Sequence, residues 1–170
     1  MNIVLTGFMA TGKTEISKAL CKLTGRKRLD TDDMVETAEG MSTNEIFALH
    51  GEKYFRAAEK EAVKKAASEI NVIIATGGGA VLDKENIEIL RMSGIIINLS
   101  PDFEVIEERL AKAAATRPLL QNQSIEDVRK RFDKRAPFYA NCDEKIHITS
   151  GKTPMEFAEE ILEIMKKYEQ

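Results

Sequence analysis

The sequence predicts an α/β protein built on a parallel sheet, because short aliphatic segments alternate with longer helical patterns along its 170 residues. Two of these segments, 72–75 and 95–97, are apolar at consecutive positions, as expected for strands that helices cover on both faces. Four or five strands are expected in all, at residues 3–5, 27–29 (the weakest pattern), 72–75, 95–99 and 146–148.

The helices between these strands are expected to begin at short capping sequences, in which Ser or Thr precedes Glu, Asp or Pro. Four such sequences occur, at Ser42 with Glu45, Ser100 with Pro101, Ser124 with Asp127, and Thr153 with Pro154. The last helix is predicted over residues 154–168, since Phe157, Ile161, Leu162 and Met165 form one apolar stripe. We interpret these hydroxyl groups as caps rather than as catalytic groups.

Length and charge favour one folded domain over residues 1–170 that binds small molecules. A chain of this size buries well over half of the surface that it exposes when unfolded. The 25 basic and 28 acidic residues give a net charge of -3 and are spread along the chain. This balance excludes an overall basic field that would recruit nucleic acid.

The sequence favours a cytoplasmic protein with no membrane partner. Met1 leads straight into an apolar segment, without the basic region and cleavage site of a signal peptide. The longest apolar runs fall far short of the roughly 20 residues that a membrane span needs. Cys21 and Cys142 lie far apart and lack a C-x-x-C partner, which argues against a zinc site or a disulfide framework.

The clearest motif is G-x-x-x-x-G-K-[ST] at residues 7–14, between a predicted strand and a predicted helix. In such a loop the backbone N–H groups turn toward phosphate oxygens, and the helix N-terminus adds its positive end. Lys13 would reach the β and γ phosphates, and Thr14 would supply an oxygen to Mg²⁺. An accidental glycine-rich turn is the weaker interpretation, because strand, loop and helix are in register.

Two carboxylates, Asp30 and Asp32, follow the predicted second strand, where ligands gather on open α/β sheets. One carboxylate could hold Mg²⁺ through water, while the other orients an acceptor hydroxyl and accepts its hydrogen bond or proton. The alternative is that Asp32 caps a helix that begins at Asp33. Capping would not exclude a catalytic role.

Three successive glycines, Gly77, Gly78 and Gly79, follow the strand predicted at 72–75. Such a run is useful where a ligand approaches the backbone closely or where φ must be positive. Backbone amides at Gly78 could then bind substrate hydroxyls. The alternative is a plain turn into a helix near Asp83.

Three arginines stand in distinctive sequences, at Arg56, Arg117 and Arg135. The fork of a guanidinium group binds both oxygens of a carboxylate or phosphate at once, so an anionic acceptor would use one or two of them. Taken singly, each is more simply interpreted as a solvated surface residue.

In order and spacing, these motifs resemble those of the shikimate kinases over nearly the whole chain. The resemblance rests on residues 7–14, Asp30-x-Asp32, Phe55-Arg56, Gly77-Gly78-Gly79, Arg117-Pro118-Leu119-Leu120 and Arg135-Ala136-Pro137-x-Tyr139. It implies a three-layer α/β/α P-loop kinase fold, related to nucleoside monophosphate kinases, with a five-stranded parallel sheet. It also implies a shikimate-binding lobe near residues 32–60 and a lid near residues 111–123.

For the acceptor, the resemblance implies that two arginines clamp the shikimate carboxylate while Asp32 and the glycines hold the ring hydroxyls. Asp32 would lie next to the hydroxyl that is phosphorylated. The residues concerned are Asp32, Arg56, Gly77, Gly78, Gly79 and Arg135. Glu59, one helical turn beyond Arg56, could orient that arginine.

For the nucleotide, the resemblance implies an ATP site made of Ala10, Thr11, Gly12, Lys13, Thr14, Glu15, Arg109, Arg117 and Lys152. The metal would be Mg²⁺, held by Thr14 and, through water, by Asp30. Arg117 on the lid would move over the phosphates and stabilise charge on the transferring group. Lys13, Asp32 and Arg117 are therefore the expected catalytic residues.

The adenine pocket is where the chain departs most from the family pattern. Many members have Gly where this chain has Ala10. Arg109 and Lys152 are the nearest matches to the arginines that approach adenine elsewhere in the family. His147 alternates with apolar residues in a strand pattern, which favours a structural role.

The expected activity is the Mg²⁺-dependent transfer of the γ-phosphoryl group of ATP to the 3-hydroxyl of shikimate, by a protein that is a monomer. A kinase acting on another small acid or polyol such as gluconate, or on a nucleoside monophosphate, is the first alternative. A nucleotide-binding module without catalysis is the second, although such modules usually lose a motif that this chain retains.

Overall fold

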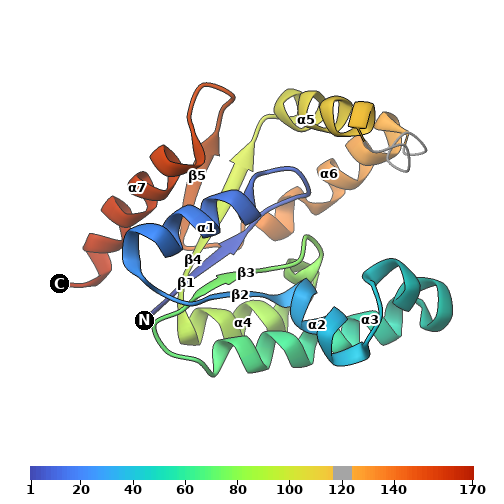
Figure 1. Cartoon of the computed structure of the whole chain (residues 1–170), viewed down its shortest axis with the longest axis horizontal. Helices are drawn as coiled ribbons and strands as arrows, with labels where there is room; N and C mark the ends of the chain where they lie inside the picture. Colours follow the sequence, from blue (N-terminus) through green and yellow to red (C-terminus); the bar gives the residue numbers. More distant parts are fainter. Residues whose placement is uncertain (117–123) are drawn as a thin grey trace.

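A computed structural model describes residues 1–116 and 124–170 and contains a five-stranded, all-parallel sheet with the strand order β2-β3-β1-β4-β5 (Figure 1). The strands are β1 (Asn2–Thr6), β2 (Arg28–Asp30), β3 (Ile73–Ala75), β4 (Gly94–Pro101) and β5 (Glu144–Ile148). All five predicted strands are therefore confirmed, including the weak one near residue 28.

Helices cover both faces of this sheet, which confirms the predicted fold class (Figure 1). They are α1 (Lys13–Thr24), α2 (Thr31–Glu39), α3 (Thr43–Ala67), α4 (Lys84–Ser93), α5 (Phe103–Thr116), α6 (Ile125–Tyr139) and α7 (Pro154–Met165). Within residues 1–116 and 124–170 there are also two short 3-10 turns, η1 (Ala80–Leu82) after β3 and η3 (Lys166–Tyr168) after α7.

Three of the four predicted caps are confirmed. Ser42 and Ser124 accept a hydrogen bond from a backbone amide three residues on, and Thr153 forms a complete capping box with Glu156. The prediction at Ser100 is wrong, because β4 continues through Pro101 and α5 begins only at Phe103. Pro101 stays in the sheet beside the edge strand β5. The last helix ends at Met165, and a 3-10 turn continues to Tyr168.

Alternate residues of the inner strands β1, β3 and β4 contribute to two separate cores. Ile3 and Leu5 face α1 and α7, and pack with apolar residues such as Phe157. Val4 faces the opposite side, where the core is formed with α3 and α4 and extends to Phe8. The central strand is thus covered on both faces, which fixes the position of the loop that follows it.

A third, smaller cluster joins α2 to α3 and consists of Val35, Ile46, Phe55 and Ala62. The predicted shikimate-binding lobe, residues 32–60, corresponds to α2 after its first residue and to α3 as far as residue 60. Helix α3 is kinked at Gly51, where φ is 82°. Of the predicted lid, residues 111–116 belong to α5, and residues 117–123 lie outside the described residues.

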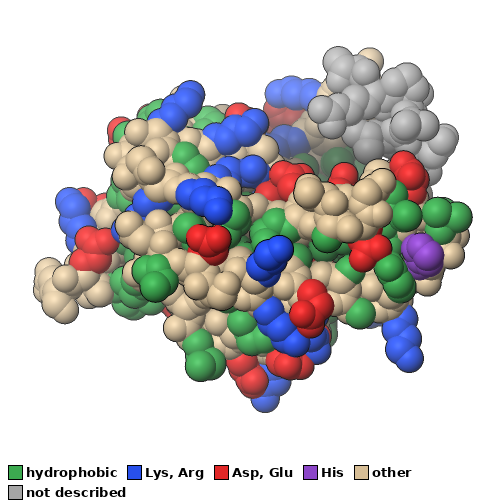
Figure 2. Space-filling view, turned by 60° about the horizontal axis from the view of Figure 1, so that its bottom comes forward, with side chains coloured by type: hydrophobic (Ala, Val, Ile, Leu, Met, Phe, Trp, Pro, Cys, Tyr) green, Lys and Arg blue, Asp and Glu red, His purple; other side chains and the backbone are tan. Residues whose placement is uncertain are grey.

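Acidic and basic side chains are interspersed on the face drawn in Figure 2, as the near-balanced composition leads one to expect. Among the helices of residues 1–116 and 124–170, none combines the length and the apolar character that crossing a membrane requires.

Candidate active site

The carboxyl ends of three neighbouring strands carry the predicted site residues. The chain leaves β1 into the loop 7–12, leaves β2 at Asp30 directly into α2, and leaves β3 into Gly77. Because β1 lies between β3 and β4, the order of the strands reverses beside the loop that follows β1. Ligands bind at such a switch point in open α/β sheets.

The loop after β1 leads from the strand into α1, as the motif predicts. Gly12 precedes α1 with a φ of 96°, a left-handed conformation that glycine adopts without strain. The ammonium group of Lys13 donates to the carbonyl oxygens of Gly7 and, at 2.9 Å, of Phe8. Arg109 donates from Nη1 to the carbonyl oxygen of Ala10 at 2.9 Å, which ties α5 to this loop.

Ala10 is the loop residue at which the chain departs from the family pattern, and its φ is 61°. This left-handed conformation costs a residue with a Cβ about 1–2 kcal/mol. Replacing Ala10 by glycine would remove this cost. Part of the gain in stability would be offset, because glycine also increases the conformational entropy of the unfolded chain. We therefore expect Ala10→Gly to raise the free energy of unfolding by about 1 kcal/mol, as measured by urea denaturation.

Asn71→Gly is the matched control for this prediction. Asn71 has the same φ of 61°, but an asparagine tolerates the left-handed region better than an alanine does. Its replacement should change stability less. A stability of Ala10→Gly below that of the wild type would contradict the assignment of strain to this position.

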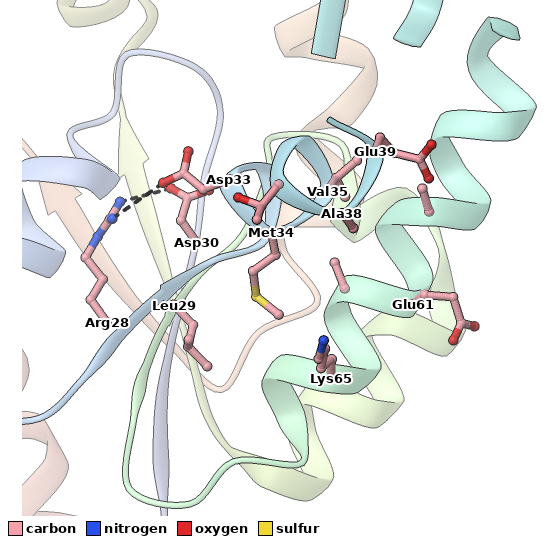
Figure 3. A pocket seen from close by; sticks show the side chains of 13 residues that line it. Arg28, Leu29, Asp30, Asp33, Met34, Val35, Ala38, Glu39, Glu61 and Lys65 are labelled. Atoms are coloured by element: carbon pink, nitrogen blue, oxygen red, sulfur yellow. Dashed lines mark hydrogen bonds and ion pairs between the residues drawn. The ribbon is translucent and has the colours of Figure 1, made fainter. Parts of the chain in front are cut away.

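Asp30, and not Asp32, caps helix α2. The helix begins at Thr31, and Asp30 Oδ1 accepts hydrogen bonds from the amides of Asp32 (3.0 Å) and Asp33 (3.1 Å). Its other oxygen pairs with Arg28 at 2.9 Å (Figure 3). The alternative in which Asp32 caps a helix starting at Asp33 is therefore wrong, because the helix begins two residues earlier and leaves the Asp32 carboxylate available.

The Asp32 side chain lies against the glycine segment. A Cβ atom placed on Gly77 would lie 2.3 Å from Asp32 Oδ1, so only glycine fits there. Burial, followed by the nearby carboxylates of Asp30 and Glu59, raises the pKa of Asp32 to about 6, and Lys13 opposes this rise. Burial lowers the pKa of Lys13 to about 8, against the attraction of Asp32. These two groups thus face one site with pKa values on either side of neutrality.

Close approach, and not backbone conformation, explains two of the three glycines, Gly77 and Gly79. None of Gly77, Gly78 and Gly79 has a positive φ, so that part of the prediction is wrong. A Cβ on Gly79 would lie 2.4 Å from the guanidinium of Arg56. One on Gly78 would lie 3.6 Å from Arg135 Nη1. Gly77 and Gly79 therefore let Asp32 and Arg56 approach this backbone segment, which a plain turn into η1 would not require, whereas Arg135 lies at an ordinary contact distance from Gly78.

Arg56 is held by the buried carboxylate of Glu59, as predicted. The distance from Arg56 Nη1 to Glu59 Oε1 is 2.9 Å, and Glu59 is 1% exposed. Burial raises the pKa of Glu59, and the positive charge of Arg56 opposes the rise. Glu52 adds a second, longer ion pair at 3.6 Å from Arg56 Nε, so two carboxylates orient the guanidinium group beside Gly79.

Arg135 reaches the same segment from α6, with its guanidinium carbon 6.0 Å from the centre of the Phe8 ring. Tyr139 lies one helical turn after Arg135 on the same helix. Its hydroxyl donates a hydrogen bond to the carbonyl oxygen of Gly78. Tyr139 is a site residue to which the sequence motifs gave no role. Its place in the Arg135 motif was the only signal for it.

The other predicted residues lie at the margin of this cluster or outside the described residues. Thr14 and Glu15 are exposed in the first turn of α1. Lys152 pairs with Glu160 at 2.9 Å and lies over the ring of Phe157. Arg117 falls outside the described residues. His147 is exposed on β5, with Nε2 3.3 Å from Asp102.

An open cavity of about 570 Å³ is lined by residues of β2, α2 and α3 (Figure 3). Its floor is apolar, with Leu29, Met34 and Val35, and it shares only Asp30 with the predicted site. Lys13, Asp32 and the two arginines do not line it. We therefore place the chemistry at the strand ends and not in this cavity.

The donors near Lys13 suit Mg²⁺ bound mainly through substrate and water. In the described part of the chain, no group of three or more His, Cys, Asp or Glu side chains is arranged to hold a metal ion. Mg²⁺ in kinases is usually held by one or two protein oxygens together with phosphates and waters. A threonine hydroxyl and one carboxylate, Thr14 and Asp30, meet that requirement.

Comparisons with known proteins point to one family. The family model for shikimate kinase matches residues 9–166. A shikimate kinase from Caldanaerobacter subterraneus subsp. tengcongensis is 47% identical over 165 residues, which is 95% of this chain and 94% of the relative. One from Caldicellulosiruptor bescii is 43% identical over 164 residues, 96% of this chain and 94% of the relative.

Solved structures give the same result. The structure of shikimate kinase from Acinetobacter baumannii in complex with shikimate superposes with a TM-score of 0.86 at 32% identity, covering 98% of this chain and 93% of that one. Shikimate kinase from Aquifex aeolicus superposes with a TM-score of 0.83 at 30% identity, covering 99% and 98%. The chain therefore belongs to the shikimate kinase family, and its activity is the ATP-dependent phosphorylation of shikimate.

Proposed function

We propose that the residues gathered around Gly77–Gly79 form the acceptor site, and that the loop 7–14 presents the γ-phosphoryl group of ATP to the 3-hydroxyl of shikimate. The observation that carries this proposal is the meeting of Asp32, Arg56 and Arg135 on one glycine segment. A carboxylate and two guanidinium groups complement a ligand that has hydroxyls and a carboxylate of its own.

In the acceptor site, Arg56 and Arg135 bind the shikimate carboxylate, and the backbone of Gly78 contacts a ring hydroxyl. Glu59 holds Arg56 by its paired oxygen, so the guanidinium group is oriented before the substrate arrives. The 3-hydroxyl, which is the one that is phosphorylated, lies at Asp32.

In the nucleotide site, the backbone amides of residues 10–15 and the ammonium group of Lys13 bind the phosphates. In the absence of nucleotide that ammonium group donates to the loop carbonyls, so it must turn toward the phosphates when ATP binds. Arg109 already contacts the loop through the carbonyl oxygen of Ala10. We assign contacts with the adenine base to Arg109 and Lys152.

We assign Mg²⁺ to Thr14 and, through water, to Asp30. Both Asp30 oxygens already accept hydrogen bonds, yet a carboxylate offers about four lone-pair sites, which leaves room for a bound water. The ion would neutralise charge on the phosphates. The protein side chains carry the rest of the chemistry.

In the reaction, Asp32 accepts the hydrogen bond or the proton of the attacking hydroxyl as that oxygen bonds to the γ-phosphorus. The bond to the bridging oxygen of ADP breaks on the opposite side, and Lys13 stabilises the charge that develops there. Arg117, which lies outside the described residues, is assigned a second stabilising charge and the exclusion of water. Catalysis is then mainly positioning and electrostatics.

A coupled assay of ADP release tests this function. With Mg²⁺ and ATP, shikimate is expected to accelerate ADP release, whereas gluconate and nucleoside monophosphates are not. The match to shikimate kinases over nearly the whole chain speaks against those rival acceptors. ATP binding without any shikimate-dependent turnover would indicate a module without catalysis and contradict the proposal.

Arg135→Ala is expected to raise the apparent KM for shikimate roughly ten- to a hundredfold, since a charged hydrogen bond is worth about 1.5–3 kcal/mol. The KM for ATP should stay unchanged. Arg129→Ala is the matched control, because Arg129 lies on the same helix but is exposed and pairs with Asp133. An unchanged shikimate KM in Arg135→Ala would show that this residue does not bind the carboxylate.

We also infer that the protein acts as a monomer in the cytoplasm. Cys21 and Cys142 are free thiols, which suits a reducing compartment. Light scattering of the purified chain is expected to give a mass near the 19.0 kDa of one chain. A mass twice as large at assay concentrations would contradict the monomer.

A further inference from the structure

Thr31 forms a buried link between two parts of the acceptor site. It is the first residue of α2, lies between Asp30 and Asp32, and is 0% exposed. Its Oγ1 accepts a hydrogen bond from the amide of Gly77 at 2.9 Å, across 46 residues of sequence. The link therefore joins the end of β2 to the glycine segment after β3.

Both ends of this hydrogen bond lie next to groups that we assign to the acceptor. Asp32 follows Thr31, and Gly78 follows Gly77. The Asp32 carboxylate is so close to Gly77 that an added Cβ would lie 2.3 Å from its oxygen. Because no space separates these two groups, a shift of the Gly77 backbone would displace the Asp32 carboxylate as well.

The rest of the glycine segment is anchored independently of Thr31. The Gly77 carbonyl oxygen accepts from the amide of Ala80 at 3.1 Å, and the Gly78 carbonyl oxygen accepts from Tyr139. The Gly77 amide is a buried donor whose partner is the Thr31 hydroxyl. Without that hydroxyl the donor would be unsatisfied, and the segment would have to move toward water to satisfy it.

We propose that Thr31 is a positioning residue for phosphoryl transfer, which sets the distance between the Asp32 carboxylate and the Gly78 backbone and thereby orients the shikimate ring. It acts through these neighbours. The inference rests on the proposed acceptor site and goes beyond it, since it predicts an effect on shikimate alone and not on the nucleotide.

Thr31→Val and Thr31→Ser separate the hydroxyl group from the shape of the side chain. Valine keeps the branched shape and removes the acceptor, whereas serine keeps the acceptor and loses a methyl group. Thr24→Val is the matched control, because Thr24 Oγ1 also accepts from a backbone amide, that of Arg26 at 3.2 Å, but lies at the far end of α1.

The experiment is steady-state kinetics of ADP release with shikimate and MgATP varied in turn, together with the melting temperature of each variant. Thr31→Val is expected to raise the shikimate KM about tenfold and to lower kcat, with the MgATP KM unchanged. Thr31→Ser and Thr24→Val should keep the wild-type shikimate KM. If Thr31→Val does not fold, Thr31→Ala gives the same comparison.

A wild-type shikimate KM in folded Thr31→Val or Thr31→Ala would overturn the inference and leave the proposed function intact. So would a KM in Thr31→Ser as high as in Thr31→Val, because the hydroxyl would then not be the cause. Equal increases in the KM values for shikimate and MgATP would show a merely structural role. Absence of shikimate-dependent turnover in the wild type would overturn the proposed function and this inference together.

Discussion

Asp32→Asn is expected to lower kcat by roughly 10²–10⁴-fold, the range that a positioned general base contributes. Asparagine has nearly the same shape and can still hydrogen-bond a hydroxyl, but it cannot take up a proton or supply negative charge. Burial and the neighbouring carboxylates hold the pKa of Asp32 at about 6, so it is ionised at neutral pH and close to the value that suits a base there.

The pH profile of kcat/KM shows in which protonation state each of Asp32 and Lys13 is active. As the pH rises through about 6, Asp32 loses its proton and the rate should increase. As the pH rises through about 8, Lys13 loses its charge and the rate should fall. The wild type is therefore expected to give a bell-shaped profile whose two limbs belong to the coupled pair. In Asp32→Asn the acid limb should disappear.

Asp33→Asn is the control, since Asp33 is the next carboxylate in the same helical turn and its side chain is 71% exposed. It should keep the wild-type kcat and the acid limb. A raised shikimate KM with an unchanged kcat in Asp32→Asn would show that Asp32 only orients the hydroxyl.

The melting temperature of Asp32→Asn at pH 7 should not fall, because a raised pKa means that the folded protein disfavours the ionised carboxylate.

The sequence was sufficient to predict the elements of this fold because their signals are local. Consecutive apolar residues marked the strands, and the glycines, Lys13 and Thr14 marked the loop between β1 and α1. The error at Ser100 is of a different kind. Pairing with β5 keeps Pro101 in the sheet, and a capping pattern in the sequence contains no information on such a neighbour.

The composition of the candidate site was predictable, but its internal contacts were not. The alternative roles of Asp30 and Asp32 differ by where α2 begins, and the structure shows that it begins at Thr31, with the Asp30 carboxylate capping the amides of Asp32 and Asp33. The fit of Gly79 against Arg56 depends on segments brought together from α3 and β3. Such contacts across long stretches of chain leave no pattern in a single sequence, which is why Tyr139 received no role.

Lys13→Met is expected to lower kcat by about 10²–10³-fold, since one preorganised donor to the transferring group is lost. The same change should not destabilise the protein at pH 7. Burial lowers the pKa of Lys13 to about 8, which means that the folded state disfavours the ammonium form relative to the unfolded state. Methionine fills a similar volume and carries no charge, so a loss of activity here would not be due to unfolding.

The pH dependence of stability distinguishes this account from a simple loss of packing. Below pH 8, Lys13 is protonated in both the folded and the unfolded state, and the folded state bears the cost of its burial. Between about pH 8 and 10.5, the ordinary pKa of a lysine, the unfolded state binds more protons, so this contribution to the free energy of unfolding rises with pH. The wild type should therefore gain stability relative to Lys13→Met from pH 8 to 10 in urea denaturation.

Lys18→Met, on the same helix but with a side chain 56% exposed, should show no such change. A constant difference between wild type and Lys13→Met over this range would mean that Lys13 is not buried as an ammonium group, and that its pKa does not set the basic limb of the rate profile.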